Sequence, residues 1–437
     1  MRLNAVKGTY DVLPDDQPRW RALLRSTAEV LGRAGVDEIT TPVFEHLEVF
    51  EKSVGESADL VVQKEMYTFE DRGGRWLTLR PEFTAGVLRA YIEHGMYTWP
   101  APVKLWSAGP AFRAENVQRG RFRQFHQVNC ELIGGRSALL DAEAIALLVD
   151  TLRAAGLAGV HVKVGSVGDL DDRERYNAYL REALTPVSDE LSEVSRERLR
   201  LNPLRVLDSK DARDQALIAR LQRPLDLLGP ASRAHFDEVV AALERWDVPF
   251  EIDPAIVRGL DYYRYTAFEV HHAGIGAQSA LGGGGRYDGL VANLGGPDVP
   301  GIGWAFGIER VLDALQGEDG ARPARQRPLA YLVPLDQEAV MEVAALAREL
   351  RAEHRIEHGY AARNPGKGLR DADRAGATLA VLRGARERAD GLVVVKDLQS
   401  GAQQRLALEA LAEHLRRVER SEPNPDEAPR HRPESAR

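Results

Sequence analysis

Residues suited to binding a nucleotide and a small cation are concentrated between Val103 and Ile133. The pattern of apolar residues predicts two strands, 103–112 and 123–133, joined by a charged loop at 114–121. Side chains two apart on a strand share a face. One face of the second strand therefore presents a flat ring, two amides and a carboxylate: Phe125, Gln127, Asn129 and Glu131. Cations and another carboxylate border the loop: Arg113, Glu115, Arg121 and Arg123. Such a sheet can hold a nucleotide beside a small cationic molecule.

Two glycine-rich stretches, 280–289 (ALGGGGRYDG) and 301–310 (GIGWAFGIER), follow later in the chain. Neither has the strand, tight turn and helix, with an acidic residue about 20 positions later, that define a dinucleotide-binding loop. We expect these glycines instead to let a strand approach a flat ligand closely. The second stretch predicts a strand, a turn and a helix that carries Arg310.

Periodicity indicates the elements that position these residues. Helical spacing predicts a helix at 20–34, and a strand-like run follows it at 36–45. A hairpin at 67–80 leads into a helix at 85–94, where the hydroxyl of Thr84 can act as a cap.

The second half of the chain contains two changes of pattern. Charged helices begin at about Asp169, and their charges are typical of solvated faces. After the linker-like stretch GEDGARPARQR, strands and helices alternate, which predicts a small α/β domain. Within this domain we expect a strand at 359–361 and a closing helix at 406–418.

Composition limits the class of protein. The chain has 437 residues with an ordinary share of apolar and charged residues, and no run approaches a membrane span. A single cysteine, Cys130, excludes an internal disulfide and a cysteine-rich zinc site. With no apolar core of a signal peptide at the N-terminus, these features predict a cytoplasmic protein. The net charge of −8 argues against a DNA-binding or general nucleic-acid-coating protein, although the arginines at 113–123 form a local cluster that can bind a specific RNA.

Several segments resemble the signatures of the histidyl-tRNA synthetase family, which belongs to the class II aminoacyl-tRNA synthetases. FRAE followed by RGRFRQFHQ (112–127) resembles motif 2 in its histidyl form, and GIGWAFGIER resembles motif 3. LRPEFTAG (79–86) resembles the family's LRPEGTA signature, with Phe83 where Gly is commoner. RGLDYY (258–263) and GGRYDGL (284–290) resemble two signatures peculiar to the histidyl enzymes. The helix and strand at 20–45 resemble motif 1, and the resemblance extends over residues 3–418.

The resemblance implies that the chain activates L-histidine with ATP and transfers it to the 3′ end of tRNA(His). Activation needs no general base, because the attacking carboxylate is already an anion, so catalysis depends on positioning and on cations. The implied catalytic residues are Arg113, Arg258 and Arg310. The implied histidine-binding residues are Glu82, Thr84, Arg113, Gln127, Glu131, Arg258, Tyr262, Tyr263 and Tyr287. The implied ATP-binding residues are Arg113, Glu115, Arg121, Phe125 and Arg310, with Mg²⁺ held mainly by the ATP phosphates.

The same resemblance implies an α+β fold. It consists of an antiparallel-sheet catalytic domain with a helical insertion, followed by an α/β anticodon-binding domain. The expected boundaries are 1–168 and 247–316 for the catalytic domain, 169–246 for the insertion, 317–327 for a linker, 328–418 for the anticodon-binding domain and 419–437 for a disordered tail. Motif 1 implies a homodimer.

Two other functions fit part of the sequence. The regulatory subunit of ATP phosphoribosyltransferase resembles these synthetases and binds histidine without activating it. That subunit typically lacks the C-terminal domain and loses motif residues, whereas this chain keeps Arg113, Arg258 and Arg310. A class II synthetase for threonine, proline or glycine would share the anticodon-binding domain but not RGLDYY and GGRYDGL.

Overall fold

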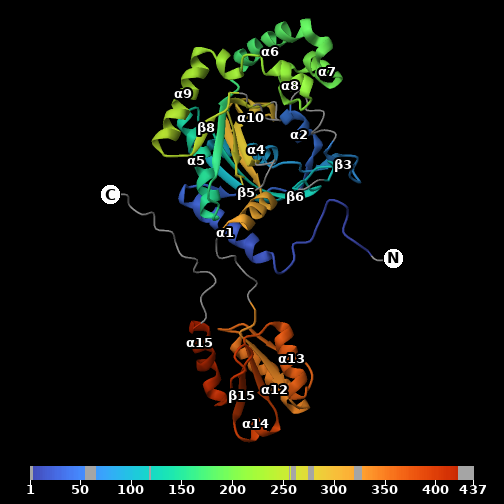
Figure 1. Ribbon diagram of the computed structural model, residues 1–437, viewed down its shortest axis with the longest axis vertical. Coiled ribbons are helices and arrows are strands. Elements are labelled where there is room, and N and C mark those ends of the chain that lie inside the picture. Colours follow the sequence, from blue (N-terminus) through green and yellow to red (C-terminus); the bar gives the residue numbers. More distant parts are fainter. Residues whose placement is uncertain are drawn as a thin grey trace. The chain divides into compact units, whose positions relative to one another are not determined.

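The computed structural model describes residues 3–54, 65–117, 120–254, 256, 262–273, 280–318 and 327–421. The chain divides into two compact units, a larger one that includes residues 19–320 and a smaller one that includes residues 321–437 (Figure 1). Among the described residues, no helix combines the length and apolar character needed to cross a membrane. The predicted tail lies mostly outside the described residues, because the last helix ends at Ser421.

The larger unit is built on an eight-stranded sheet, counted over the described residues. In sheet order its strands are β1 (Asp37–Glu38), β5 (Val103–Phe112), β6 (Gln124–Ile133), β11 (Gly301–Gly307), β10 (Ala280–Arg286), β9 (Arg264–His271), β7 (His161–Ser166) and β8 (Phe250–Ile252). The pairs from β5 to β7 are antiparallel, and the two edge pairs are parallel. The predicted antiparallel-sheet α+β fold is confirmed.

The two faces of this sheet differ in chemistry because β6 alternates. Val128, Cys130 and Leu132 pack into the main core, which α5 (Ala138–Ala154) and α9 (Pro230–Arg245) cover. The opposite face carries the alternate residues of β6 that were predicted to bind ligands, and α4 (Thr84–Glu93) packs beside it. The helices α1 (Gln17–Arg33) and α11 (Ile308–Ala314) complete the main core.

The strand predicted at 36–45 is wrong in its extent. The chain forms β1 in the large sheet and then β2 (Phe44–His46) in a separate sheet with β4 (Trp76–Leu79) and β3 (Tyr67–Glu70). The break falls at Thr41 and Pro42, where the buried guanidinium of Arg80 donates to the Thr41 carbonyl oxygen at 3.1 Å. The helix α2 (Leu47–Val54) packs against β4 and α4 of this smaller layer.

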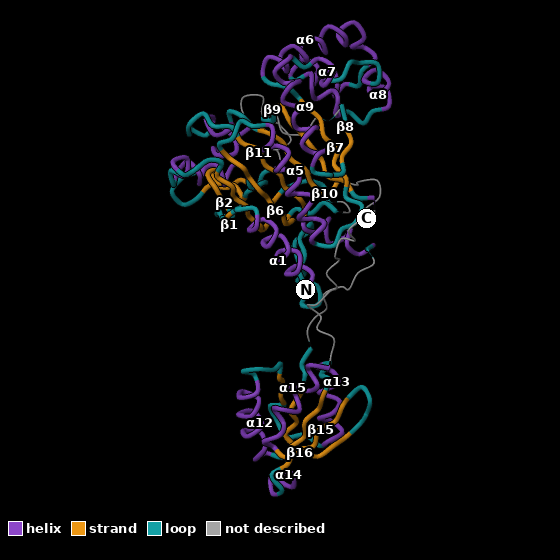
Figure 2. The backbone as a smooth tube through the Cα atoms, turned by 90° about the vertical axis from the view of Figure 1, so that its left-hand side faces the viewer, coloured by secondary structure: helices purple, strands orange, loops and turns teal. Residues whose placement is uncertain are grey.

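The helical insertion has a core of its own. The helices α6 (Leu170–Leu184), α7 (Glu193–Leu201) and α8 (Ala212–Ile218) bury a separate apolar cluster and gather beyond the β7 and β8 edge (Figure 2). The predicted insertion, 169–246, also contained α9. The buried side chains of α9 belong to the main core, so we place the end of the insertion near Leu227.

A buried carboxylate organises this insertion. Asp214 accepts hydrogen bonds from the Ser192 N–H (2.8 Å) and from the hydroxyls of Ser192, Ser195 and Ser209 (2.7, 2.6 and 2.5 Å). Burial raises the pKa of Asp214, but these hydrogen bonds outweigh burial and hold the pKa well below its ordinary value of 3.8.

Replacement of Asp214 by alanine is expected to loosen the insertion, because the hydroxyls would lose their buried acceptor. We expect a loss of about 2–4 kcal/mol in the free energy of unfolding at pH 7. The carboxylate stabilises the fold above pH 3.8, and this contribution disappears as the pH falls through the lowered folded-state pKa. Thermal unfolding and limited proteolysis would measure the effect, with the exposed Asp189→Ala as control. Equal proteolysis of both variants would contradict it.

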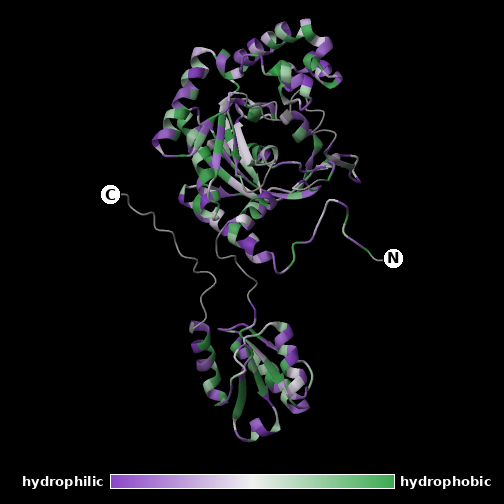
Figure 3. Cartoon of the chain, in the orientation of Figure 1, coloured by the Kyte–Doolittle hydropathy of each residue, from purple (hydrophilic) through white to green (hydrophobic). Residues whose placement is uncertain are grey.

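The smaller unit is an α/β domain. The strand order in its sheet is β13 (Ile356–His358), β12 (Ala330–Pro334), β14 (Leu379–Arg383), β15 (Leu392–Asp397) and β16 (Gln403–Ala407). Its helices are α12 (Gln337–Leu350), α13 (Pro365–Ala375), α14 (Ala385–Ala389) and α15 (Leu411–Ser421). Figure 3 shows hydrophobic residues concentrated on its strands.

Two predictions for this unit are wrong. The strand expected at 359–361 lies three residues earlier, as β13 (Ile356–His358). The helix expected from Leu406 begins at Leu411, because β16 occupies 403–407. The side chains of β16 are mostly exposed and polar, so this edge strand lacks the alternation that predicts a strand.

Candidate active site

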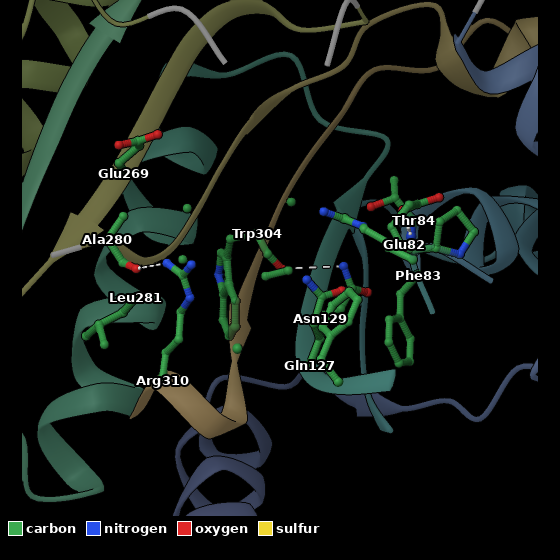
Figure 4. A pocket seen from close by; sticks show the side chains of 18 of the residues that line it. Glu82, Phe83, Thr84, Gln127, Asn129, Glu269, Ala280, Leu281, Trp304 and Arg310 are labelled. Carbon is green, nitrogen blue, oxygen red and sulfur yellow. Dashed lines mark hydrogen bonds between the residues drawn. The ribbon is translucent and has the colours of Figure 1, made fainter. Parts of the chain in front are cut away.

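A cavity of about 580 Å³ opens on the face of the large sheet that β6 was predicted to present. The described residues that were predicted to bind ligands and that line it are Glu82, Thr84, Arg113, Glu115, Arg121, Phe125, Gln127, Tyr262, Tyr263, Tyr287 and Arg310. Figure 4 shows Glu82, Thr84, Gln127 and Asn129 at one side of this cavity and Arg310 at the other. Arg258 lies outside the described residues.

Glu131 lies beneath the cavity wall and is fully buried. Its carboxylate accepts hydrogen bonds from the Thr84 hydroxyl (2.6 Å), the Asn129 amide (2.7 Å) and the Tyr287 hydroxyl (2.5 Å). Burial raises the pKa of Glu131 from 4.5 to about 7, although the three donors oppose this shift. The cavity is therefore backed by a carboxyl group that a cationic or N–H-bearing ligand would stabilise as an anion.

Glycines in β11 make room for these side chains. A Cβ atom built on Gly303 would fall within the Glu131 carboxylate, and one built on Gly301 would overlap the ring of Tyr287. The two glycines are therefore required by close approach, as expected from the sequence, although the close neighbours are site side chains.

A second carboxylate, that of the partly buried Glu82, lies at the start of α4. Glu82 accepts hydrogen bonds from the backbone N–H groups of Thr84 (2.5 Å) and Ala85 (3.0 Å). The capping role considered for Thr84 is therefore performed by Glu82, which leaves the Thr84 hydroxyl to reach Glu131. Burial raises the pKa of Glu82 even though these donors and Arg113 lower it. Phe83 is buried under the guanidinium of Arg80, 3.9 Å from the ring centre, which accommodates its departure from the family pattern.

Cations are distributed along the other half of the cavity. The guanidinium of Arg113 donates to the Pro81 carbonyl oxygen at 3.1 Å and lies 5.2 Å from the centre of the Phe125 ring. Arg121 pairs with Glu115 at 3.2 Å. Arg310 donates to the carbonyl oxygens of Ala280 (2.7 Å) and Gly120 (3.4 Å). Burial and the neighbouring Arg121 lower the pKa of Arg310, so this guanidinium favours an anionic ligand.

Other lining residues were not predicted as site residues, among them Glu65, Phe122, Glu269, Trp304 and Glu309. Phe122, Trp304 and Glu309 lie within the motif stretches at 112–127 and 301–310, whereas Glu65 and Glu269 lie outside them. The alternation of β6 correctly predicted that Asn129 lies on the cavity face, but no ligand-binding role was predicted for it. Among the described residues, its buried Oδ1 and the buried Oε1 of Gln127 have no hydrogen-bond partner.

Comparison with known proteins agrees with this geometry. The family model described as histidyl-tRNA synthetase matches residues 8–311, and the anticodon binding domain model matches residues 330–418. The histidine–tRNA ligase of Thermus thermophilus is 54% identical over 417 residues, which cover 95% of this chain and 99% of that protein. The histidine–tRNA ligase of Deinococcus radiodurans is 50% identical over 429 residues, which cover 95% of this chain and all of that protein.

The crystal structure of apo histidyl-tRNA synthetase from S. aureus is similar in fold, with a TM-score of 0.79. It is 33% identical in sequence, and the match covers 95% of this chain and 100% of that one. The full-length similarity includes the C-terminal unit, which the regulatory subunit considered above typically lacks. The chain therefore belongs to the histidyl-tRNA synthetase family of class II aminoacyl-tRNA synthetases and functions as an ATP-dependent histidine–tRNA ligase.

Proposed function

We propose that the cavity binds histidine at the end formed by Glu82, Thr84, Gln127 and Tyr263, with Glu131 behind it. The α-ammonium group would contact Glu82, Thr84 and Gln127, and the imidazole would contact Glu131 and Tyr263. Tyr262 and Tyr287 would close the pocket around the ring. The proposal is supported by two neighbouring carboxyl groups whose pKa values are raised by burial, Glu82 in the lining of the cavity and Glu131 buried behind it. Polar groups that need partners reject analogues that cannot supply them.

We propose that ATP binds at the other end. Phe125 would stack on the adenine ring, Glu115 and Arg121 would hold the adenine end and the phosphates, and Arg310 would contact the γ-phosphate. Arg113, between the two ends, would grip the α-phosphate and the substrate carboxylate. Arg258, which lies outside the described residues, keeps its proposed contact with the α-phosphate. The arginines would offset the repulsion between the attacking carboxylate and the phosphates, which is the main barrier to activation.

Mg²⁺ fits this site as an ion bound chiefly through ATP. The described residues hold no group of three or more side chains of the kinds that bind metals. Glu115 and Glu269 line the ATP end near Arg310, and one or two carboxylates together with phosphate oxygens suffice for Mg²⁺. The ion would neutralise negative charge on the phosphates when bound.

In the second step the terminal ribose hydroxyl of tRNA(His) attacks the adenylate. We propose that the loop at 114–121 contacts the acceptor end and that the C-terminal unit reads the anticodon. The match of residues 330–418 to the anticodon binding domain supports the second role. We also propose a cytoplasmic location, in agreement with the needs of translation.

The test of the site assignment is the pair of partial reactions measured on the purified full-length protein. We expect histidine-dependent ATP–pyrophosphate exchange and histidine-dependent charging of tRNA(His). Histidine binding without exchange would support the regulatory-subunit alternative. Charging with threonine, proline or glycine in place of histidine would overturn the assignment of the pocket.

We infer that the chain forms a homodimer through the region of motif 1. Phe44 and Phe69 are 56% and 41% exposed, and their pairing with Leu79 and Leu77 of β4 places them on the same face of the small sheet. Exposed aromatic residues on one face are typical of a subunit interface. Light scattering should give twice the mass of the chain, and a monomer at micromolar concentration would contradict the inference.

A further inference from the structure

The N-terminal segment at Gly8–Tyr10 contacts both elements that form the ATP end of the cavity. The Gly8 carbonyl oxygen accepts hydrogen bonds from the backbone N–H groups of Arg123 (2.8 Å) and Gln124 (3.2 Å). The Tyr10 ring lies 5.0 Å from the ring of Phe122, measured between centres. The segment is thus attached to the strand that continues into Phe125.

The same segment reaches the helix that carries Arg310. The Tyr10 hydroxyl donates to the Glu309 carboxylate at 2.7 Å. That carboxylate also accepts from the backbone N–H of His126 at 2.9 Å and lies 2.9 Å from its ring Nδ1. Glu309 therefore joins three parts of the chain, namely the N-terminal segment, β6 and α11.

The fit of the segment against the hairpin is tight. Gly8 has a φ of +88°, and a Cβ atom there would lie 2.8 Å from Cγ of Arg123 and 2.9 Å from Cγ2 of Val117. A side chain at this position would have to push the hairpin away. Since α11 is short, its direction depends strongly on what holds its first turn, and Glu309 belongs to that turn.

We propose that Gly8 and Tyr10 are positioning residues for ATP: they set the distance between the hairpin bearing Arg121 and Phe125 and the helix bearing Arg310. The inference rests on the ATP roles proposed above for those three residues. Neither Gly8 nor Tyr10 lines the cavity, so they act through Phe122, Arg123 and Glu309. The histidine end, at Glu82 and Glu131, has no contact with this segment among the described hydrogen bonds.

The test compares Tyr10→Phe with the matched control Tyr97→Phe, in which an exposed tyrosine outside the cavity loses the same hydroxyl. For Tyr10→Phe we expect the KM for ATP in pyrophosphate exchange to rise about tenfold, the loss typical of one hydrogen bond to a charged group. The KM for histidine should stay within about twofold, and the control should match the wild type. Gly8→Ala should produce the same selective rise through displacement of the hairpin.

Calorimetric titration of each variant with ATP alone separates this inference from the proposed function. If the wild type shows no histidine-dependent exchange, the proposed function fails. The affinity for ATP still tests the positioning role of Gly8 and Tyr10 in that case. If the wild type is active and Tyr10→Phe binds ATP with unchanged affinity, the positioning role is rejected. A fall in melting temperature with equal rises in both KM values would also reject it, because that result indicates a purely structural contact.

Discussion

Glu131→Gln is expected to raise the KM for histidine in ATP–pyrophosphate exchange by at least about 100-fold, with little change in the KM for ATP. Removal of a buried charged partner typically costs about 2–5 kcal/mol of binding. The amide keeps the shape of the side chain but brings an N–H group to a place where the ligand also presents donors. Steady-state exchange kinetics at varied histidine and ATP would measure the two constants.

The same variant should be at least as stable as the wild type at pH 8. The pKa of Glu131 in the folded protein is raised from 4.5 to about 7 by burial, a shift that corresponds to about 3 kcal/mol. Because the folded state binds the extra proton, the stability of the wild type relative to Glu131→Gln should fall as the pH rises from about 5 to 7 and then level off. Denaturant unfolding at several pH values would show this trend.

A suitable control is Glu143→Gln, which removes a carboxylate that pairs with Lys104 away from the cavity. This control should leave both KM values close to those of the wild type. An unchanged histidine KM in Glu131→Gln would remove Glu131 from the histidine site. A large loss of stability at pH 8 would instead indicate that its three hydrogen bonds outweigh burial.

Arg113→Lys is expected to lower kcat of pyrophosphate exchange by about 10³-fold, with smaller effects on either KM. Lysine keeps the charge but loses the planar fork that can contact the α-phosphate and the substrate carboxylate together. In the proposed role, that contact would develop fully in the transition state, and removal of one such donor costs about 10²–10³-fold in related oxyanion sites. Single-turnover formation of the adenylate would measure the chemical step directly.

Arg136→Lys provides the comparison for this second variant. Arg136 is exposed and does not line the cavity, and among the described ion pairs it has only a long contact of 3.9 Å to Asp298. Its substitution should have no measurable effect. A kcat for Arg113→Lys within tenfold of the wild type would show that Arg113 does not stabilise the transition state.

The sheet and most of the site could be predicted because their information is local. The alternation of Phe125, Gln127, Asn129 and Glu131 predicts which face of β6 lines the cavity. The intervening residues Val128 and Cys130 lie in the core on the opposite face. The hairpin before α4 was predicted from local pattern in the same way. The signatures of the family then related this strand to segments that periodicity alone leaves unconnected.

Features that depend on contacts between distant segments could not be predicted. Glu82 accepts the hydrogen bond at the start of α4 in place of Thr84. The Thr84 hydroxyl instead donates to Glu131, which lies 47 residues later. Tyr10 and Glu309 are separated by 299 positions, and each is unremarkable in its own neighbourhood. The predicted boundary at residue 246 grouped α9 with the charged helices before it, although the apolar side chains of α9 pack into the main core.

The glycines of β11 restrict how this enzyme could acquire a new amino-acid specificity. Any larger residue at Gly303 or Gly301 would displace Glu131 or Tyr287, two of the residues proposed to bind histidine. A substitution there that narrows the pocket for a smaller substrate would therefore also disturb the proposed recognition groups. Redesign toward bulkier imidazole analogues must therefore begin at side chains that do not pack against β11.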